Sequence, residues 1–257
     1  MTLIFNEIYM LNGFNNTFII AAADRRLLNM DGSYHATRKK LFPIPYLNGA
    51  ISYFGLAVFS RPNRPNLYIS DWLKDFIRNN AHCNELMSFS TSLRDELSNL
   101  VPDSILGKVP SGFHICGYDS NGNPDFWYFS NIGEMREFRY SDLRTTYDVP
   151  SSHFLGRDAI REGWNGSDKA SVSNHARVYR NGDIRAHVIA WEALDGIFAK
   201  LDQFPDFKKP TTLQQYGEYV KFKFEIIAYF YKKWANVQII ARPIDVCVLT
   251  NDGYRCQ

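Results

Sequence analysis

Strand-like and helix-like segments occur in separate groups along this chain, and their order limits the folds that it can adopt. The expected groups are strands in residues 2–55, helices in 71–100, strands in 113–140, helices in 183–235 and a strand in 244–250. Alternating or continuous apolar runs indicate the strands, and apolar residues at helical spacing indicate the helices. Because the groups are segregated, they favour a layered α+β architecture over alternating βαβ units.

Length and composition are typical of a globular chain with one core. Hydrophobic residues make up 45% of the 257 positions, which is enough to bury a core without staples. No linker, internal repeat or low-complexity tract divides the chain, so we expect one domain over residues 1–257. The stretch 151–182 is polar and lacks a clear period, and we expect an insertion or a short helix there.

Charge and cysteine content exclude several classes of function. The net charge of +2 and the scattered basic residues give no reason to expect nucleic acid as a partner. No apolar run reaches the length of a membrane span, and the N-terminus lacks a signal-peptide pattern. The four cysteines form no CxxC pair and the six histidines no HxH or HxxxH pair, so we expect neither a metal nor a cofactor. Few cysteines suit a reducing compartment, and we expect a cytoplasmic protein.

One predicted apolar strand is followed by charged residues at a distinctive spacing. The segment Phe18–Arg26 runs from an apolar stretch into Asp24, and Lys40 follows Asp24 by 16 residues on a basic segment. This pattern resembles proteasome β-type subunits of the N-terminal-nucleophile (Ntn) hydrolase family, which have the same spacing. The turn containing Gly55 fits the resemblance. Two later segments, Cys116–Asp119 and Ile244–Gly253, are similar to a hairpin and to the final strand and turn of that family.

The resemblance implies a fold, an activity and an assembly. The implied fold is a four-layer αββα sandwich of the Ntn-hydrolase type. The implied activity is that of a threonine-type hydrolase that cleaves peptide or amide bonds. The implied assembly is a ring-like homo-oligomer.

The resemblance also implies a catalytic set of Thr2, Asp24, Lys40 and Gly55. Removal of Met1 would free the α-amine of Thr2, which could then act as the base for its own hydroxyl. A nearby Lys40 ammonium would keep that amine neutral, because a like charge lowers an amine's pKa. Asp24 would hold Lys40, and the backbone N–H of Gly55 would face the developing oxyanion.

The sequence departs from the family pattern in three places. The first hairpin, from Thr2 to Asp24, is longer than in the family, and residues 12–16 are where the extra length fits. The family's late Asp and Ser-Gly-Gly positions fall on Val237 and on Ile240 to Arg242, which carry neither polar group. Its Gly-Ser-Gly turn has no clear match; the segment 153–158 is nearest, with Asp158 as a substitute.

Each of these assignments has an alternative. Asp24 and Lys40 could form a structural ion pair, and Gly55 could simply satisfy a tight turn. The chain could then be a catalytically inactive, proteasome-like subunit with a structural or assembly role. A third possibility is an amidase of the same fold that acts on a small molecule.

Overall fold

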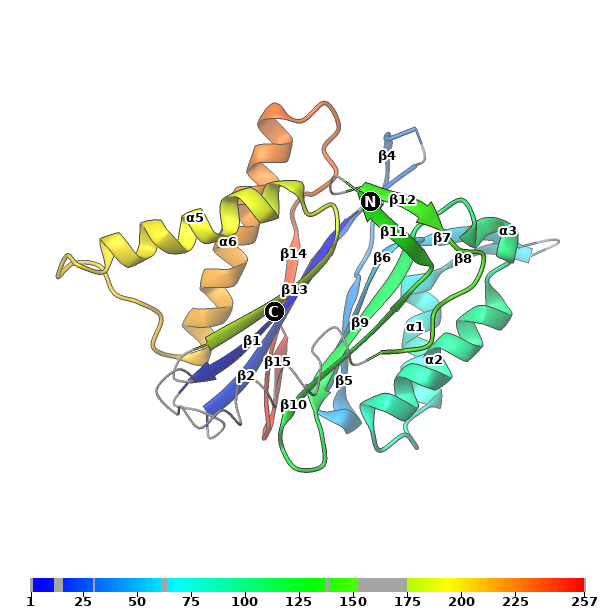
Figure 1. The fold of residues 1–257 in the computed structure, drawn as a ribbon, viewed down its shortest axis with the longest axis horizontal. Helices are drawn as coiled ribbons and strands as arrows, with labels where there is room; N and C mark the ends of the chain where they lie inside the picture. The colour runs from blue at the N-terminus through cyan, green and yellow to red at the C-terminus, as the bar shows by residue number, and fades with distance from the viewer. Residues whose placement is uncertain are drawn as a thin grey trace.

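The computed structural model describes residues 2–11, 16–29, 31–61, 64–136, 139–151 and 175–256. Most of its strands belong to two antiparallel sheets, which lie between pairs of helices (Figure 1). Three further pairs of short strands form ribbons outside these sheets.

The first sheet has five strands in the order β13-β1-β2-β14-β15. Its strands are β1 (Leu3–Leu11), β2 (Asn16–Asp24), β13 (His175–Gly182), β14 (Ile244–Thr250) and β15 (Gly253–Cys256). The two ends of the chain therefore meet in one sheet, because β2 pairs with β14 along its length.

The second sheet has four strands in the order β10-β9-β6-β5. Its strands are β5 (Leu41–Ile44), β6 (Gly49–Gly55), β9 (Ser111–Tyr118) and β10 (Pro124–Ser130). The ribbons are β3 (Arg26–Leu28) with β4 (Tyr34–Thr37), β7 (Val58–Arg61) with β8 (Arg64–Tyr68), and β11 (Ile132–Arg136) with β12 (Arg139–Leu143).

Five α-helices lie in the part of the chain that the structure describes. They are α1 (Ile69–Asn79), α2 (Leu86–Leu100), α3 (Asp103–Leu106), α5 (Arg185–Leu201) and α6 (Leu213–Trp234), and a 3-10 turn, η2, covers Pro45–Leu47. The sequence favours either Thr211 or Thr212 as the cap of the last helix. In the structure Thr212 caps α6 and exchanges hydrogen bonds with Gln215 in a capping box.

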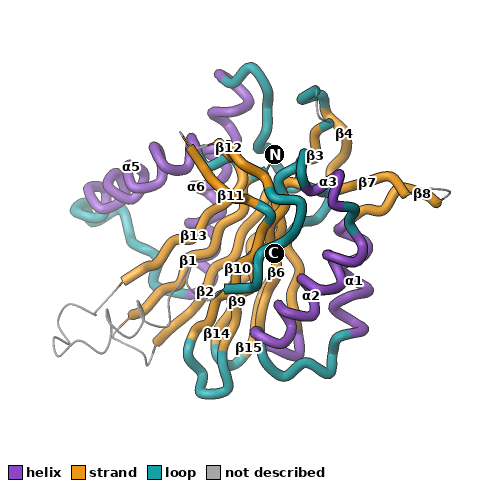
Figure 2. The backbone as a smooth tube through the Cα atoms, turned by 45° about the vertical axis from the view of Figure 1, so that its right-hand side comes forward, coloured by secondary structure: helices purple, strands orange, loops and turns teal. Residues whose placement is uncertain are grey.

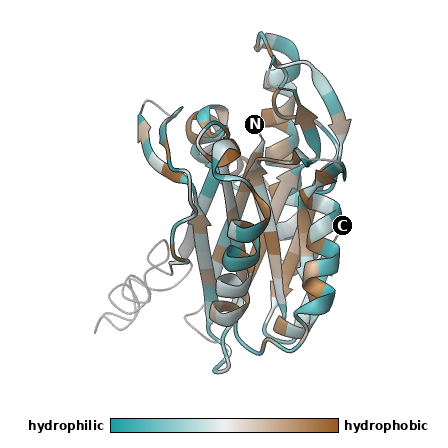
Figure 3. Ribbon diagram, turned by 90° about the vertical axis from the view of Figure 1, so that its right-hand side faces the viewer, coloured by the Kyte–Doolittle hydropathy of each residue, from teal (hydrophilic) through white to brown (hydrophobic). Residues whose placement is uncertain are grey.

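Three apolar clusters separate the sheets and helices. One joins α1 and α2 to the four-stranded sheet, one joins α5 and α6 to the five-stranded sheet, and the third lies between the two sheets. Figure 2 shows the helices on the outer sides of the strands, and Figure 3 shows hydrophobic residues along the strands. A mixed architecture of helices and several sheets is therefore confirmed.

The alternation of side chains explains the apolar run before Asp24. In β2, Phe18, Ile20 and Ala22 face α6, whereas Ile19 and Ala21 face the second sheet. A strand covered on both faces has no polar side, which is why this run is continuous.

Two sequence-based expectations differ from the structure. The segment 61–66 is rich in turn residues and its sequence favours a loop, but β7 extends to Arg61, and β8 begins at Arg64 and includes Pro65 and Asn66. Residues 152–174 of the expected insertion, and 12–15 of the first turn, lie outside the described residues. The described end of the insertion is β13, which pairs with β1.

Cys247 and Cys256 are directly opposite each other in β14 and β15 and form a disulfide. Disulfides are typical of oxidising compartments, and the sequence did not predict this pair. The cytoplasmic location stays a prediction. Among the described residues, no helix is both long and apolar enough to cross a membrane.

Candidate active site

The fold brings Thr2, Asp24 and Lys40 together from three separate segments. Thr2 precedes β1 and Asp24 ends β2, and the antiparallel register that pairs Ile4 with Ala23 places these two ends side by side. Lys40 comes from the other sheet, directly before β5. The site therefore lies where one end of the five-stranded sheet meets the four-stranded sheet.

The three side chains make direct contact and are almost completely buried. Lys40 Nζ donates to Thr2 Oγ1 at 2.5 Å and to Asp24 Oδ1 at 3.5 Å. The Thr2 hydroxyl donates to Asp24 Oδ1. Relative exposures are 2% for Thr2, 0% for Asp24 and 1% for Lys40. The predicted contact between Asp24 and Lys40 is present, and Thr2 joins it.

Backbone groups complete the coordination of both charged side chains. Asp24 accepts hydrogen bonds from the N–H of Leu3 at 3.1 Å and of Arg26 at 2.9 Å. Lys40 Nζ also donates to the carbonyl of Arg26 at 2.5 Å. Asp24 and Lys40 therefore hold the entry of β1 and the exit of β2 in fixed positions.

Burial dominates the protonation of the pair. It raises the pKa of Asp24 above the usual carboxyl value, although Lys40 and the N–H groups of Arg26 and Leu3 act in the opposite direction. It lowers the pKa of Lys40 below the usual lysine value, against the attraction of Asp24. A lysine with a lowered pKa beside a hydroxyl gives up its proton more readily than an ordinary lysine.

Gly55 ends β6 in a conformation that favours glycine. Its φ is +80°, and a Cβ there would lie 1.8 Å from the carbonyl oxygen of Pro110. The Tyr53 N–H donates to Lys40 O, whereas the Leu56 N–H points to the opposite edge and donates to Pro110 O. Since successive N–H groups of a strand alternate between its edges, the Gly55 N–H leaves β6 on the edge of Lys40. The tight turn after β6 explains why residue 55 is a glycine. The register of β6 directs the Gly55 N–H toward the edge where Lys40 lies.

A second turn next to Thr2 was missed by sequence reasoning. The Asp183 N–H donates to Thr2 O at 2.7 Å. Gly182 has a φ of +94°, and a Cβ there would lie 1.7 Å from the same oxygen. Tyr140 Oη accepts the Gly182 N–H at 2.6 Å, which fixes this turn from the side. The side chain of Asp183 favours it as the cap of the following helix, but Ile184 occupies the cap position of α5 and no side chain caps it. Asn181-Gly182-Asp183 is a turn signal that could have located the contact with Thr2.

The Asp183 carboxylate is engaged elsewhere. It accepts hydrogen bonds from Tyr231 Oη at 2.6 Å and from Arg185 at 2.5 Å. Burial raises its pKa, but these hydrogen bonds bring the pKa below its usual value. Asp183 thus holds α5 and α6 against the turn, while its backbone holds Thr2.

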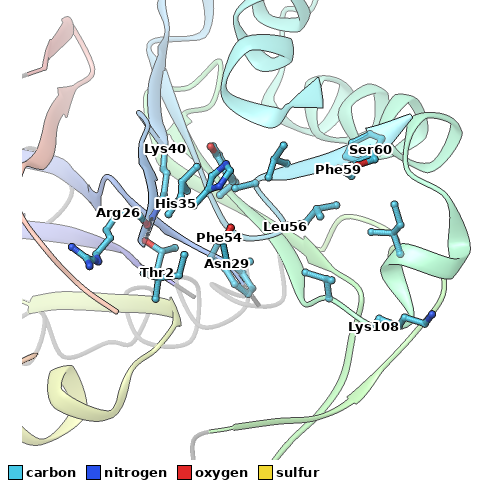
Figure 4. Close-up of a pocket in the computed structure, with 18 of the residues that line it drawn as sticks. Thr2, Arg26, Asn29, His35, Lys40, Phe54, Leu56, Phe59, Ser60 and Lys108 are labelled. Atoms are coloured by element: carbon cyan, nitrogen blue, oxygen red, sulfur yellow. Dashed lines mark hydrogen bonds between the residues drawn. The ribbon is translucent and has the colours of Figure 1, made fainter. Parts of the chain in front are cut away.

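A cleft of about 510 Å³ opens beside the three polar residues and is also lined by Gly55. In Figure 4, Thr2, Arg26 and Lys40 lie together on one side of this cleft, and Lys108 lies on the opposite side. The guanidinium of Arg26 packs over the ring of Tyr34, 5.0 Å from its centroid.

The positions where the family pattern breaks carry no substitute in the described structure. Ile240 is fully buried in the cluster under α6, and Ala241 is buried beside it. Val237 is 37% exposed. The segment 153–158, which includes Asp158, lies outside the described residues.

Comparisons with known proteins correct the family assignment. No family model matches the chain, and no curated protein matches it. A solved structure of the Anbu (Gly-1) mutant from Hyphomicrobium sp. strain MC1 is similar at 11% identity and a TM-score of 0.46. The match covers 100% of this chain and 85% of that one, but a likeness this distant supports no functional argument.

The expected membership in the proteasome β-subunit-like Ntn hydrolase family is therefore wrong. The resemblance depended on a few spaced polar residues and short apolar strands. Buried strands in many folds share such composition. The geometry of the site has to be judged by itself.

Proposed function

We propose that this chain is a threonine-type hydrolase of amide or peptide bonds, with Thr2 as its nucleophile once Met1 has been removed. The contact that supports this is the 2.5 Å approach of Lys40 Nζ to Thr2 Oγ1, beside Asp24 and at the wall of a cleft. A hydroxyl needs an activating neighbour to act as a nucleophile, and this one has a buried cation in contact.

In the proposed reaction, Thr2 Oγ1 attacks the carbonyl carbon of the substrate. The freed α-amine of Thr2 takes the hydroxyl proton, and the Lys40 ammonium stabilises the oxygen as it loses that proton. The Gly55 N–H donates to the carbonyl oxygen as it becomes negative. The C–N bond then breaks, the amine leaves with the proton, and an ester to Thr2 remains. Water hydrolyses this ester and restores the hydroxyl.

The helix–sheet–sheet–helix order of the apolar clusters supports the same proposal. We propose that it is the four-layer αββα sandwich expected from the sequence. In that arrangement the first residue of an inner strand lies between two covered sheets. A nucleophile there would be shielded from water on all sides except that of the cleft.

Intact mass and acylation together test the enzyme proposal. Native protein made without a tag should lack one methionine, and an activated ester such as p-nitrophenyl acetate should then acylate Thr2 in a rapid burst. Thr2→Ala should abolish the burst, and Lys40→Met should slow it by roughly 10²- to 10³-fold, as loss of one stabilising group does in serine hydrolases. Lys39→Met is the matched control, because Lys39 packs on Phe42 outside the site. A retained Met1, or a burst that persists in Thr2→Ala, would refute the mechanism.

A non-catalytic role as a homo-oligomeric subunit is the second candidate. Asp24 binds two backbone N–H groups at the strand ends, and such contacts stabilise a fold whether or not chemistry occurs. Ile189 on α5 and Trp234 on α6 are 77% and 73% exposed, which is apolar surface that a second copy of the chain could cover. Light scattering after size-exclusion chromatography tests this: a dimer or larger species that Trp234→Glu makes monomeric supports it, and a monomeric wild type contradicts it.

A further inference from the structure

The cleft beside Thr2 is walled by apolar side chains, and two of them belong to no core. Leu28 and Val58 line it and are half-buried, yet neither belongs to any of the three apolar clusters or packs against one. Leu56 and Phe59 continue the wall as buried members of the cluster under α1 and α2. Apolar side chains that face a concave space without contributing to a core are typical of ligand pockets.

The charges around the cleft lie at its margins. None of the described residues that line it is acidic. Lys108 is exposed, and Figure 4 shows its amine at the end remote from Thr2. The Arg26 side chain packs on Tyr34. The part of the lining that runs from Gly55 to Phe59 therefore offers van der Waals contact and no charged partner, whereas Asn29, His35, Ser60 and Ser104 supply polar atoms elsewhere around the cleft.

We infer that the acyl part of the substrate, the part that becomes esterified to Thr2, carries a bulky, uncharged, apolar group that fills this cleft. The inference rests on the proposed function, since it is Thr2 that would hold the acyl group beside the wall. A volume of about 510 Å³ exceeds what a methyl or a single small side chain needs and lies within the range of sites for small organic ligands. A bulky apolar amino acid before the scissile bond and a non-peptide acyl amide both provide this chemistry.

The same wall determines which acyl groups the site accepts. A charged acyl group would lose its hydration without gaining a partner between Leu28 and Val58, so it would be rejected. A small acyl group would leave the wall uncovered and gain little binding energy. One methylene in an apolar pocket changes specificity by roughly tenfold or more, so differences between acyl groups should be large.

A series of p-nitrophenyl esters tests the inference separately from the mechanism. Acetate reports on Thr2 alone, hexanoate adds an apolar chain, and a monoester of adipic acid and a trimethylammonium hexanoate add opposite charges at similar length. After subtraction of the Thr2→Ala background, we expect kcat/KM for hexanoate to exceed that for acetate by roughly tenfold or more, and both charged esters to fall below hexanoate.

Charge variants at the wall give the decisive result. Val58→Asp should lower kcat/KM for hexanoate and raise that for the cationic ester, and Val58→Lys should favour the anionic ester instead. Leu28→Asp should repeat the first result from the other side of the wall. Val149→Asp is the matched control, because Val149 is 71% exposed and does not line the cleft. All rates for that variant should equal the wild type.

The outcomes separate the two proposals. A burst with acetate but no preference for hexanoate, or charge variants that leave the preference unchanged, would overturn the inference while Thr2 stays the nucleophile. No burst with any ester would overturn the mechanism and this inference with it. If the preference holds, peptides with Leu or Phe before the scissile bond and a fatty acyl amide of matched size then distinguish the two substrate sources.

Discussion

Acid should destabilise this protein through a histidine far from the candidate site. His114 on β9 is completely buried between the sheets. Its Nδ1 lies 2.7 Å from Asn6 Oδ1 on β1, and its Nε2 lies 2.8 Å from the amide nitrogen of Asn181 on β13. The first contact requires a donor and the second an acceptor, so the neutral tautomer with its proton on Nδ1 fits both. A second proton would point an N–H at the donor of Asn181.

The size of the effect follows from the shift in pKa. Burial lowers the pKa of His114 from the ordinary 6.5 to about 3. Because the folded value is depressed, the stabilisation is complete above pH 6.5 and is lost as the pH falls toward 3. The loss is about 1.4 kcal/mol per pH unit, or about 2 kcal/mol by pH 5. His187, buried against Trp191 with its pKa also lowered by burial to about 3, should add a similar amount.

Urea unfolding at pH 7, 6 and 5 measures this directly. The free energy of unfolding should fall by about 4 kcal/mol between pH 7 and 5 for the two histidines together. In His114→Gln the starting stability will differ, but the fall should be about half as large, since one titrating group has gone. His82→Gln is the control, because His82 is exposed, and its fall should match the wild type. An equal fall in His114→Gln, or a wild type whose stability does not change over this range, would refute the reasoning.

Three other predictions concern the turn, the helices and the cysteines. Gly182→Ala should destabilise the fold by at least about 1–3 kcal/mol in urea unfolding, because a Cβ would strike Thr2 O and the φ is unfavourable for alanine; an unchanged midpoint would contradict the geometry. Lys223→Ala should lower the free energy of unfolding in urea by about 3–5 kcal/mol, because it leaves the buried Glu7 carboxylate without its cation. A loss below about 1 kcal/mol would mean that the ion pair contributes little to stability. Alkylation in denaturant without reductant should modify two of the four cysteines, since Cys247 and its partner are joined; four modified cysteines would exclude the disulfide.

Local pattern was enough to predict much of the secondary structure. The strand β14, Ile244–Thr250, was predicted with its observed bounds, because it is apolar and bounded by Pro243 and by the turn at residues 251–253. A threonine cap was predicted from the side chains of Thr211 and Thr212, and the structure has Thr212 in that position. These features depend on residues adjacent in sequence, so a single sequence is sufficient to find them.

Features that depend on distant residues could not be found in the same way. The edge strand β13 has no apolar alternation, since its sequence includes Arg177, Arg180 and Asn181, and it becomes a strand only by pairing with β1. The approach of Gly182 to Thr2 joins opposite parts of the chain, and no local signal reports it. The contact between Asp24 and Lys40 was expected only from the family resemblance, and it is present because Asp24 ends one strand and Lys40 directly precedes another.

The contacts of Lys40 show why stability and activity have to be measured together at this site. An ammonium has three N–H donors, and the acceptors here are Thr2 Oγ1, Asp24 Oδ1 and Arg26 O. Removing the Thr2 hydroxyl leaves one buried donor of a charged group without a partner, which costs about 1–3 kcal/mol. Thr2→Ala would thus lower stability in the catalytic and in the structural interpretation alike. Thr2→Ser keeps the acceptor and the hydroxyl, so an enzyme should keep both its stability and its burst. If Thr2→Ser folds as the wild type does but neither protein is acylated, Thr2 serves only to pair Lys40.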